Sequence, residues 1–455
     1  MDISSIEKQS EDRINSVFWD GATTQMVKIG SGALSSVPEC LDRLFPGQPV
    51  VVVADRNTYA AAGRAVCEIL RATGREVLDP FVFEEDELHA DYDQVEILQR
   101  FLSGNQAVPV AVGSGTINDL TKLAAHQCDR PYMVVGTAAS MDGYTAFGAA
   151  ITRGGYKQTI SCPAPVAVVI DLNVIADAPS NMNAAGYADL IAKVPAGADW
   201  LVADALGVEA IHAEAFGFVQ THLREWVSNP SGVRKGDASA LLGLSEGLIM
   251  TGIGMQRAQS SRPASGADHQ FSHLWDMQGH TYEGATPMHG CKVAIGSIAS
   301  TVMYEQVLAM NARDLKTDET SIRAYRPAWE QVEQSILDNF PDASLAEQVV
   351  TQSRDKYLDV AALSERLQCL EKNWDAIRSK IEKQIIPSGE LRQMLADAGA
   401  PHEPEEIGID RKRLLASHAQ AKMIRARYTV LDLVAEAGWW TTCVEDSFKA
   451  GGFWA

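Results

Sequence analysis

The chain of 455 residues lacks the features that mark secreted, membrane-spanning and nucleic-acid-binding proteins. Its seven cysteines are scattered and form no CxxC pair, which excludes a regular disulfide framework and fits a reducing compartment. Lysine and arginine number 39 against 59 aspartates and glutamates, and the net charge of −20 argues against a nucleic-acid or anionic-membrane partner. The polar start, MDISSIEKQSEDRINS, has no apolar core, and no run of about eighteen apolar residues suggests a membrane helix. These absences predict a cytoplasmic protein without membrane insertion.

Histidine, in contrast, is concentrated in one stretch, residues 262–290, which holds four of the ten: His269, His273, His280 and His289. His269 and His273 are four residues apart and share one face of a helix, and His289 would begin a second helix after a glycine-containing turn. Two or three of these imidazoles could converge on a divalent cation together with a carboxylate, for which Asp189 in GYADLIAK is the best candidate. The spacing is not HExxH, so a coincidental pair on a helix surface or in the core remains the alternative.

The first 180 residues alternate between apolar, β-branched runs and helical patterns, as in a buried parallel sheet with crossover helices. A hairpin is expected around Gly154 and Gly155. Beyond residue 180 helical periodicity continues to the end, apart from a polar insertion or connection at 312–334. We therefore expect an α/β domain over 1–180 and an all-α domain over 181–455, with a ligand cleft between them. The strand patterns fall within residues 27–45, 49–59, 75–83, 107–126, 131–150 and 165–179.

One expected strand runs into a glycine-rich turn that opens a helix. The turn is formed by Gly113, Ser114, Gly115 and Thr116, and Asp119 lies in the first turn of the helix. Backbone N–H groups at such a turn suit a pyrophosphate. The pattern is not GxGxxG, so a tight strand–helix turn without a ligand is the other interpretation.

Two further strand ends carry polar side chains. Asp55 follows an early strand and could bind an adenosine ribose hydroxyl or cap the next helix. Small residues follow a later strand, where a planar ring could approach the backbone beside the hydroxyls of Thr137 and Ser140. Asp142 could bind a substrate hydroxyl there, or cap a small-residue turn.

Five motifs occur in one order: GSGTINDL, TAASMDGY, GYADLIAKVPAGADW, SRPASGADHQFSH and MHGCKVAIG. Together they resemble the sn-glycerol-1-phosphate dehydrogenase family, within the larger group of iron-containing alcohol dehydrogenases, glycerol dehydrogenases and 3-dehydroquinate synthases. The resemblance covers roughly residues 27–300 and resumes at RARYTVLDLVAEAG. It implies a Rossmann-like nucleotide domain followed by a helical metal-binding domain.

The resemblance also implies a metal site. The family's three ligands fall on Asp189, His269 and His289, and Lys193 stands where the related iron alcohol dehydrogenases place a further histidine. His273 would then lie beside the metal as a proton relay or a nicotinamide contact. Asp268 departs from the family, which often has glutamate before its first ligand histidine.

For the coenzyme, NAD(H) or NADP(H), the resemblance implies three groups of contacts. Asp55 matches the position near the adenosine ribose, and an acid there leans toward NADH. The segment between nicotinamide and substrate matches Thr137, Ser140 and Asp142. The pyrophosphate loop matches Gly113, Ser114, Gly115 and Asp119.

The implied activity is the reversible reduction of dihydroxyacetone phosphate to sn-glycerol 1-phosphate with Zn²⁺, Ni²⁺ or Fe²⁺. Asp142 would orient the substrate's free hydroxyl, and the cations nearest the motifs for its phosphate are Lys193, Arg257 and Arg262. The alternatives are a dehydrogenase of an unphosphorylated polyol such as glycerol, a lyase like 3-dehydroquinate synthase, and a non-catalytic nucleotide- or metal-binding protein. The resemblance also suggests a homodimer or a higher homo-oligomer.

Overall fold

The computed structural model describes residues 3–85, 87–154 and 156–455. The chain divides into two compact units, each assembled from more than one stretch. Unit 1 comprises Met1–Leu190, Gly217–Ser261 and Asp397–Ala400, and unit 2 comprises Ile191–Phe216, Arg262–Ala396 and Pro401–Ala455. The single division at residue 180 stays a prediction.

Unit 1 is built on the parallel sheet that the apolar runs predicted, so the α/β expectation for this part of the chain is confirmed. The strand order is β1-β8-β5-β4-β2-β3, and each neighbouring pair is parallel. Central strands are covered on both faces, so every position of β4 and β8 is buried, and apolar residues predominate in both up to Asp171 at the end of β8. The strands are β1 (Met26–Gly30), β2 (Val50–Asp55), β3 (Phe81–Phe83), β4 (Val108–Gly113), β5 (Met133–Gly136) and β8 (Ala167–Asp171).

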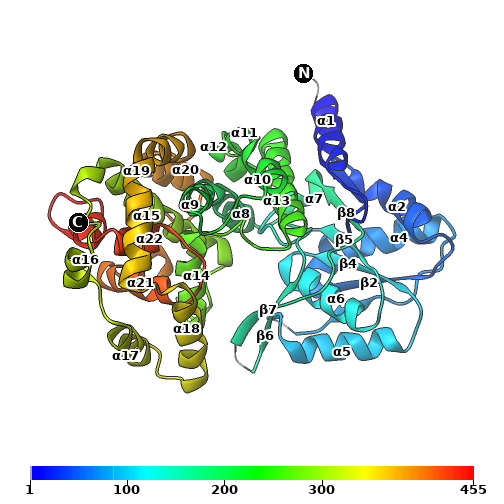
Figure 1. Ribbon diagram of the computed structural model, residues 1–455. Helices are drawn as coiled ribbons and strands as arrows, with labels where there is room; N and C mark the ends of the chain where they lie inside the picture. Colours follow the sequence, from blue (N-terminus) through cyan, green and yellow to red (C-terminus); the bar gives the residue numbers. More distant parts are fainter. Residues whose placement is uncertain (1–2, 86, 155) are drawn as a thin grey trace. The chain divides into compact units, whose positions relative to one another are not determined.

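Helices lie on both sides of this sheet (Figure 1). On one side α2 (Val37–Leu44) and α4 (Arg64–Ala72) bury Leu41 and Leu70 against alternate strand residues. On the other side are α5 (Tyr92–Ser103) and α6 (Gly115–Gln127). Such crossover helices connect one parallel strand to the next. All strands therefore end at the same edge of the sheet, the carboxyl edge, and the loops that follow them lie there.

The remaining elements of unit 1 extend the sheet domain. The predicted hairpin is present as β6 (Ala149–Arg153) paired antiparallel with β7 (Tyr156–Ile160). Gly154 has a positive φ of 60°, and Gly155 lies outside the described residues. The helical elements are α1 (Ile3–Ser16), η1 (Ala33–Ser36), α3 (Arg56–Thr58), η2 (Tyr59–Gly63), α7 (Leu172–Asp177), α8 (Ser180–Ile191), α10 (Ala213–Gln220), α11 (Leu223–Trp226), α12 (Pro230–Lys235) and α13 (Ala238–Ala258), of which α8 and α10 reach into unit 2.

Helix α13 is long and apolar enough to cross a membrane by length and composition alone. Its most apolar window has a mean hydropathy of 1.3, and 83% of that window is buried inside the protein. Core helices of globular proteins have the same properties, and burial over most of its surface explains why this helix is largely apolar.

Unit 2 is helical, as the periodicity beyond residue 180 predicted. The histidine-rich stretch forms α14 (Ala267–Met277), a return loop and α15 (His289–Ala309), which confirms the expected helix–loop–helix. Helix α14 packs against α15 and α21. The other elements are α9 (Lys193–Ala205), η3 (Ala312–Asp314), α16 (Glu319–Tyr325), α17 (Trp329–Asn339), α18 (Ala343–Lys356), α19 (Val360–Gln384), α20 (Ser388–Ala398, shared with unit 1), η4 (Pro404–Ile407), α21 (Arg411–Met423), α22 (Val430–Glu436), α23 (Trp440–Cys443) and η5 (Glu445–Phe448).

Candidate functional site

The loop after β4 brings a glycine-flanked serine to the start of α6. Gly113 ends the strand, Ser114 is the N-cap in an extended conformation, and Gly115 begins the helix. The first N–H groups of a helix attract anions, so the turn has the geometry that a pyrophosphate needs. A Cβ on Gly113 would lie 2.5 Å from the Cβ of Ile117, so close packing of strand on helix also requires this glycine. Both interpretations of the turn are therefore compatible with the structure.

The segment after β5, residues 137–148, lies beside this turn. Ser140 Oγ and Ser114 Oγ are 2.6 Å apart, and the Thr137 N–H donates to the Gly113 carbonyl at 3.1 Å. The fully buried Lys122 fixes the far end of the segment, because its ammonium donates at 3.1, 3.0 and 3.0 Å to the carbonyls of Gly143, Ala146 and Gly148. Sequence reasoning missed this lysine, whose only signal is its place among the apolar residues of α6.

Two of the predicted coenzyme-binding acids have structural contacts of their own. Asp55 caps α3: its Oδ1 accepts the Thr58 N–H at 2.7 Å, and Thr58 Oγ1 accepts the Asp55 N–H at 3.0 Å. Asp119 Oδ2 accepts the Ala150 N–H at 3.1 Å, at the start of the hairpin. The capping interpretation of Asp55 is thus realised, and the coenzyme contacts of both acids stay predictions.

Helix α8 carries Asp189, whose side chain is fully buried. Asp189 Oδ2 accepts the backbone N–H of Asp142 at 3.1 Å, so the structure brings these two predicted residues together. The approach of α8 depends on Gly186, because a Cβ there would lie 1.7 Å from the Ala139 carbonyl oxygen. Backbone contact at a glycine therefore sets how Asp189 faces the 137–148 segment.

In unit 2 three histidines gather at α14 and the start of α15. The ring centroid of His269 lies 5.2 Å from that of His289 and 6.3 Å from that of His273, and the rings of His273 and His289 are 6.2 Å apart. His280 has a different role: its Nε2 donates to the Ile407 carbonyl at 2.6 Å, and burial lowers its pKa. Only the first three histidines form a cluster.

The hydrogen bonds around two of these rings identify residues that sequence reasoning did not assign. Asp268 Oδ2 lies 2.5 Å from Nδ1 of His269, and Ser272 Oγ lies 3.3 Å from Nδ1 of His289. Asp268 is completely buried. The only signal in the sequence is that the acid Asp268 directly precedes His269, and sequence alone does not show that its carboxylate points toward the imidazole.

Asp189 of unit 1 and His269 and His289 of unit 2 each offer one ligand atom of a type that binds metal ions. Two imidazoles with one carboxylate suit Zn²⁺, Ni²⁺ or Fe²⁺, and three protein ligands leave coordination positions for water or substrate. The donor set therefore fits a catalytic divalent cation. His273 is half-buried beside the two ligand histidines, and its role stays a prediction.

The three cations suggested for a substrate phosphate differ in their surroundings. Lys193 begins α9 and is completely buried. The guanidinium of Arg257 lies over the Trp19 ring, 5.0 Å from its centroid. Buried Arg262 donates to the Asp199 carbonyl at 2.9 Å and pairs with a Glu209 carboxylate oxygen at 3.3 Å. Arg257 and Arg262 thus have structural roles, and a phosphate contact stays a prediction for all three.

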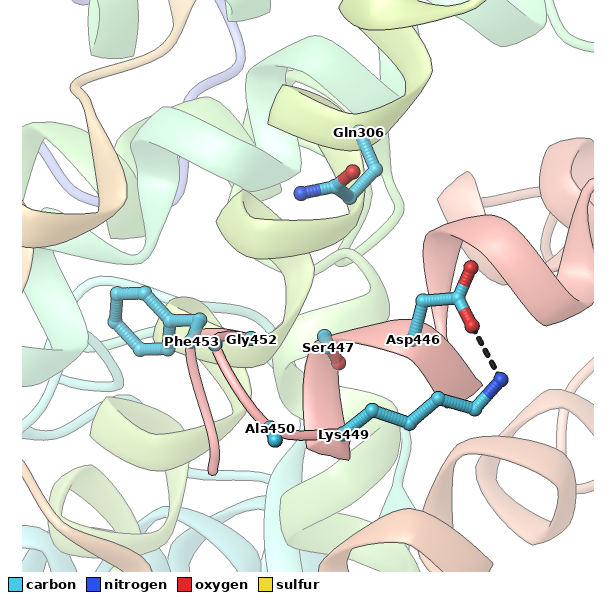
Figure 2. A pocket seen from close by; sticks show the side chains of 8 residues that line it. Gln306, Asp446, Ser447, Lys449, Ala450, Gly452 and Phe453 are labelled. Carbon is cyan, nitrogen blue, oxygen red and sulfur yellow. Dashed lines mark hydrogen bonds and ion pairs between the residues drawn. The ribbon is translucent and has the colours of Figure 1, made fainter.

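Unit 2 also has a hollow of about 440 Å³ at the carboxyl-terminal end (Figure 2). Figure 2 shows the Lys449 ammonium at its rim pairing with Asp446, at 2.6 Å. This exposed pair neutralises its own charge, so the hollow offers little to a charged ligand. Its lining residues are Gln306, Asp446, Ser447, Lys449, Ala450, Gly451, Gly452 and Phe453, which include none of the predicted site residues.

Comparisons with known proteins agree with the resemblance drawn from the motifs. The sequence pattern of the iron-containing alcohol dehydrogenases matches residues 28–179. A glycerol-1-phosphate dehydrogenase (NAD(P)+) from Halalkalibacterium halodurans is 33% identical over 281 residues, which are 61% of this chain and 70% of the relative. One from Bacillus velezensis is 30% identical over 437 residues, 94% of this chain and 97% of the relative.

Solved structures share the fold. Glycerol dehydrogenase from Schizosaccharomyces pombe has a TM-score of 0.60 at 15% identity, and the matched region covers 95% of this chain and 92% of the chain of that structure. A probable glycerol dehydrogenase from Sinorhizobium meliloti has a TM-score of 0.57 at 15% identity, covering 92% and 97%. At this identity the likeness concerns the fold alone, and it confirms the predicted combination of a sheet domain with a helical domain.

Proposed function

Since the chain belongs to the glycerol-1-phosphate dehydrogenase family of the iron-containing alcohol dehydrogenases, we propose that it catalyses the reversible, NAD(P)H-linked reduction of dihydroxyacetone phosphate to sn-glycerol 1-phosphate. The observation that carries this proposal is the match to the Bacillus velezensis relative over nearly the full length of both chains. The function therefore rests on both units and not on the coenzyme domain alone.

In this proposal Asp189, His269 and His289 hold one divalent cation. The support is their chemistry, two imidazoles and a carboxylate, and the short separation of the two histidine rings in unit 2. When bound, the metal ion supplies Lewis acidity at the ketone oxygen and the nicotinamide coenzyme supplies the hydride. The protein's own groups then have to position the reactants and move one proton.

The coenzyme contacts that we propose lie at the carboxyl edge of the unit 1 sheet. The pyrophosphate would lie on the N–H groups of Gly113, Ser114 and Gly115 at the start of α6, with Asp119 one turn further along the helix. Thr137 and Ser140 would contact the nicotinamide end, since Ser140 already touches Ser114. Asp55 would contact the adenosine ribose at the end of β2.

Three residues would act on the substrate. Asp142 orients its free hydroxyl, and its backbone N–H is already held by the Asp189 carboxylate. His273 relays the proton to the ketone oxygen from its position beside the two ligand histidines. Lys193, at the start of α9 and one turn beyond Asp189 in sequence, supplies positive charge for the phosphate.

The test is NADH or NADPH oxidation with dihydroxyacetone phosphate and, in parallel, dihydroxyacetone, each before and after chelator treatment. We expect metal-dependent turnover that favours the phosphorylated ketone. Preference for the free ketone would move the assignment to a polyol dehydrogenase. Conversion of a substrate without net coenzyme consumption would indicate the lyase chemistry, and no turnover of either ketone would indicate a non-catalytic binding protein.

Assembly and location complete the proposal. A homodimer or a higher homo-oligomer working in the cytoplasm fits a metabolic enzyme with a net charge of −20 and with the long apolar helix α13 largely buried. Size-exclusion chromatography with light scattering would measure the oligomeric state.

A further inference from the structure

We propose that Asp268 is the positioning residue that orients His269 for metal binding. Its carboxylate is completely buried at the start of α14 and lies between two N–H donors. Oδ2 faces Nδ1 of His269 at 2.5 Å, and Oδ1 accepts the Gly266 N–H at 3.0 Å. This inference rests on the metal site proposed above.

The hydrogen bond selects the nitrogen through which His269 acts. A carboxylate accepts only, so the imidazole carries its proton on Nδ1 and presents Nε2 as the basic nitrogen. An anionic acceptor also makes that imidazole a stronger electron donor to a cation. Asp268 therefore sets both the tautomer and the orientation of the ring.

The second ligand histidine has a weaker support on the same helix. His289 Nδ1 lies 3.3 Å from the Ser272 hydroxyl, which is neutral and whose distance is long for a hydrogen bond involving a hydroxyl. Ser272 and Asp268 are four residues apart and so lie on one face of α14. One helix thus supports both rings, and the charged contact is the one that we expect to dominate metal affinity.

Asparagine at position 268 would break this arrangement without changing its size. The two oxygens of Asp268 both face N–H donors, and an amide keeps only one oxygen. If the amide oxygen faces His269, the NH₂ group faces the Gly266 N–H, so two donors meet and neither finds an acceptor. If the NH₂ group faces His269, it favours the proton on Nε2, which prevents metal binding.

The experiment measures zinc affinity of the chelator-treated full-length protein by competition with a chromophoric chelator, without substrate or coenzyme. We expect Asp268→Asn to weaken Zn²⁺ binding by about 10- to 100-fold, the range for lost carboxylate support of a ligand histidine. Asp268→Glu keeps the charge but displaces it by one methylene, so we expect a smaller, severalfold loss. Ser272→Ala should lose less than Asp268→Asn, and Asp375→Asn, which removes an exposed charge in the same unit, should bind zinc as the wild type does.

The d–d absorption of the Co²⁺-loaded protein provides a second readout, because it reports the geometry around the metal. A folded Asp268→Asn protein with wild-type zinc affinity and an unchanged cobalt spectrum would overturn the proposal. If that variant does not fold, Asp268→Glu decides between the two roles. Changed zinc affinity at an unchanged melting temperature of the apo-protein supports positioning, whereas a lower melting temperature at unchanged affinity assigns Asp268 to the fold alone. Since zinc binding is measured without turnover, these outcomes are independent of whether dihydroxyacetone phosphate proves to be the substrate.

Discussion

Replacing Gly186 by alanine tests how α8 is placed against the 137–148 segment. The added Cβ would lie 1.7 Å from the Ala139 carbonyl oxygen and 3.1 Å from the Ser140 Cα, both of them backbone atoms. A carbon–oxygen contact needs about 3.3 Å, so helix and segment must separate by about 1.6 Å. No side-chain rotation relieves such a contact.

The stability effect combines two terms of opposite sign. Overpacking costs up to about 3 kcal/mol when the neighbours are rigid, whereas alanine in a helix gains about 1 kcal/mol over glycine. We expect Gly186→Ala to lower the free energy of unfolding by about 2 kcal/mol. Gly389→Ala is the matched control, because a Cβ at this exposed position in α20 meets nothing within 4 Å. It should be neutral or stabilising by up to about 1 kcal/mol.

The functional effect should be larger than the stability effect. Asp189 lies one turn beyond Gly186, and its carboxylate accepts the Asp142 N–H at 3.1 Å. Since a displacement of about 1 Å can cost about 100-fold in rate, kcat/KM for the ketone should fall by about that factor at temperatures where the variant is folded. Urea denaturation, monitored by circular dichroism, measures the change in stability, and steady-state kinetics measure the change in kcat/KM. If Gly186→Ala matches Gly389→Ala in both stability and kcat/KM, the close backbone contact does not exist.

Three further predictions follow from single side chains. Lys122→Met leaves three buried carbonyls without their shared donor and should lower the free energy of unfolding, measured by urea denaturation, by about 3–5 kcal/mol. The control Lys380→Met, at a side chain that is 45% exposed, should lower it by about 0.5 kcal/mol or less. Equal losses in the two variants would contradict the role of Lys122. Burial lowers the pKa of His418 to about 4, so the unfolded chain binds the proton more tightly, and stability is lost as pH falls from 6.5 toward 4. Between pH 7.5 and 5 that loss is about 2 kcal/mol, and His418→Asn should abolish it; an unchanged pH slope would refute the assignment. His269→Ala and Asp189→Ala should lose bound metal, measured by elemental analysis, together with activity, and retained metal with full turnover would disprove the ligand set.

Local patterns predicted the elements because each pattern reflects the environment of one segment. The run from Val50 to Ala54 is apolar throughout since β2 is covered on both faces, and this burial identifies a parallel strand without knowledge of its neighbours. The start of α15 at His289 was predicted from the glycine-containing turn before it. In both cases the residues that carry the signal are the residues that form the element.

Contacts between distant segments could not be predicted in this way. Gly186 looks like any helical glycine until the Ala139 carbonyl is placed against it, and Asp268 looks like an ordinary acid of a first helical turn. The same holds for Lys122, whose three acceptors lie 21 to 26 residues further along the chain. Only the tertiary fold distinguishes these residues from neighbours of the same type, and two of them, Gly186 and Asp268, lie next to the proposed ligands Asp189 and His269.

The motif RARYTVLD, which begins at residue 425, shows that α14, the helix that carries His269, depends on contacts from outside residues 262–290. Buried Asp199 accepts the N–H of Ala267, the first residue of α14, and that of Val430, the first residue of α22, each at 2.7 Å. Tyr304 donates to the same carboxylate at 2.5 Å. Desolvation raises the pKa of Asp199 to about 7, and the charge of Arg262 and the hydrogen bonds from Tyr304 and Ala267 act against that effect by stabilising the ionised form.

Asp199 therefore joins the amino-terminal ends of two helices that are distant in sequence, where a negative charge is most favourable. Loss of the Val430 donor would leave Oδ1 of this buried carboxylate with the Tyr304 donor, while its other oxygen holds the first turn of α14, two residues from His269. The chain between α15 and α22 can vary in length at little cost, because loop-closure entropy grows only slowly with the number of residues. The resemblance fades after residue 300 and resumes at residue 425, where the motif supplies the Val430 donor; together with α21, which packs on α14, it supports the helix that carries the proposed ligand His269.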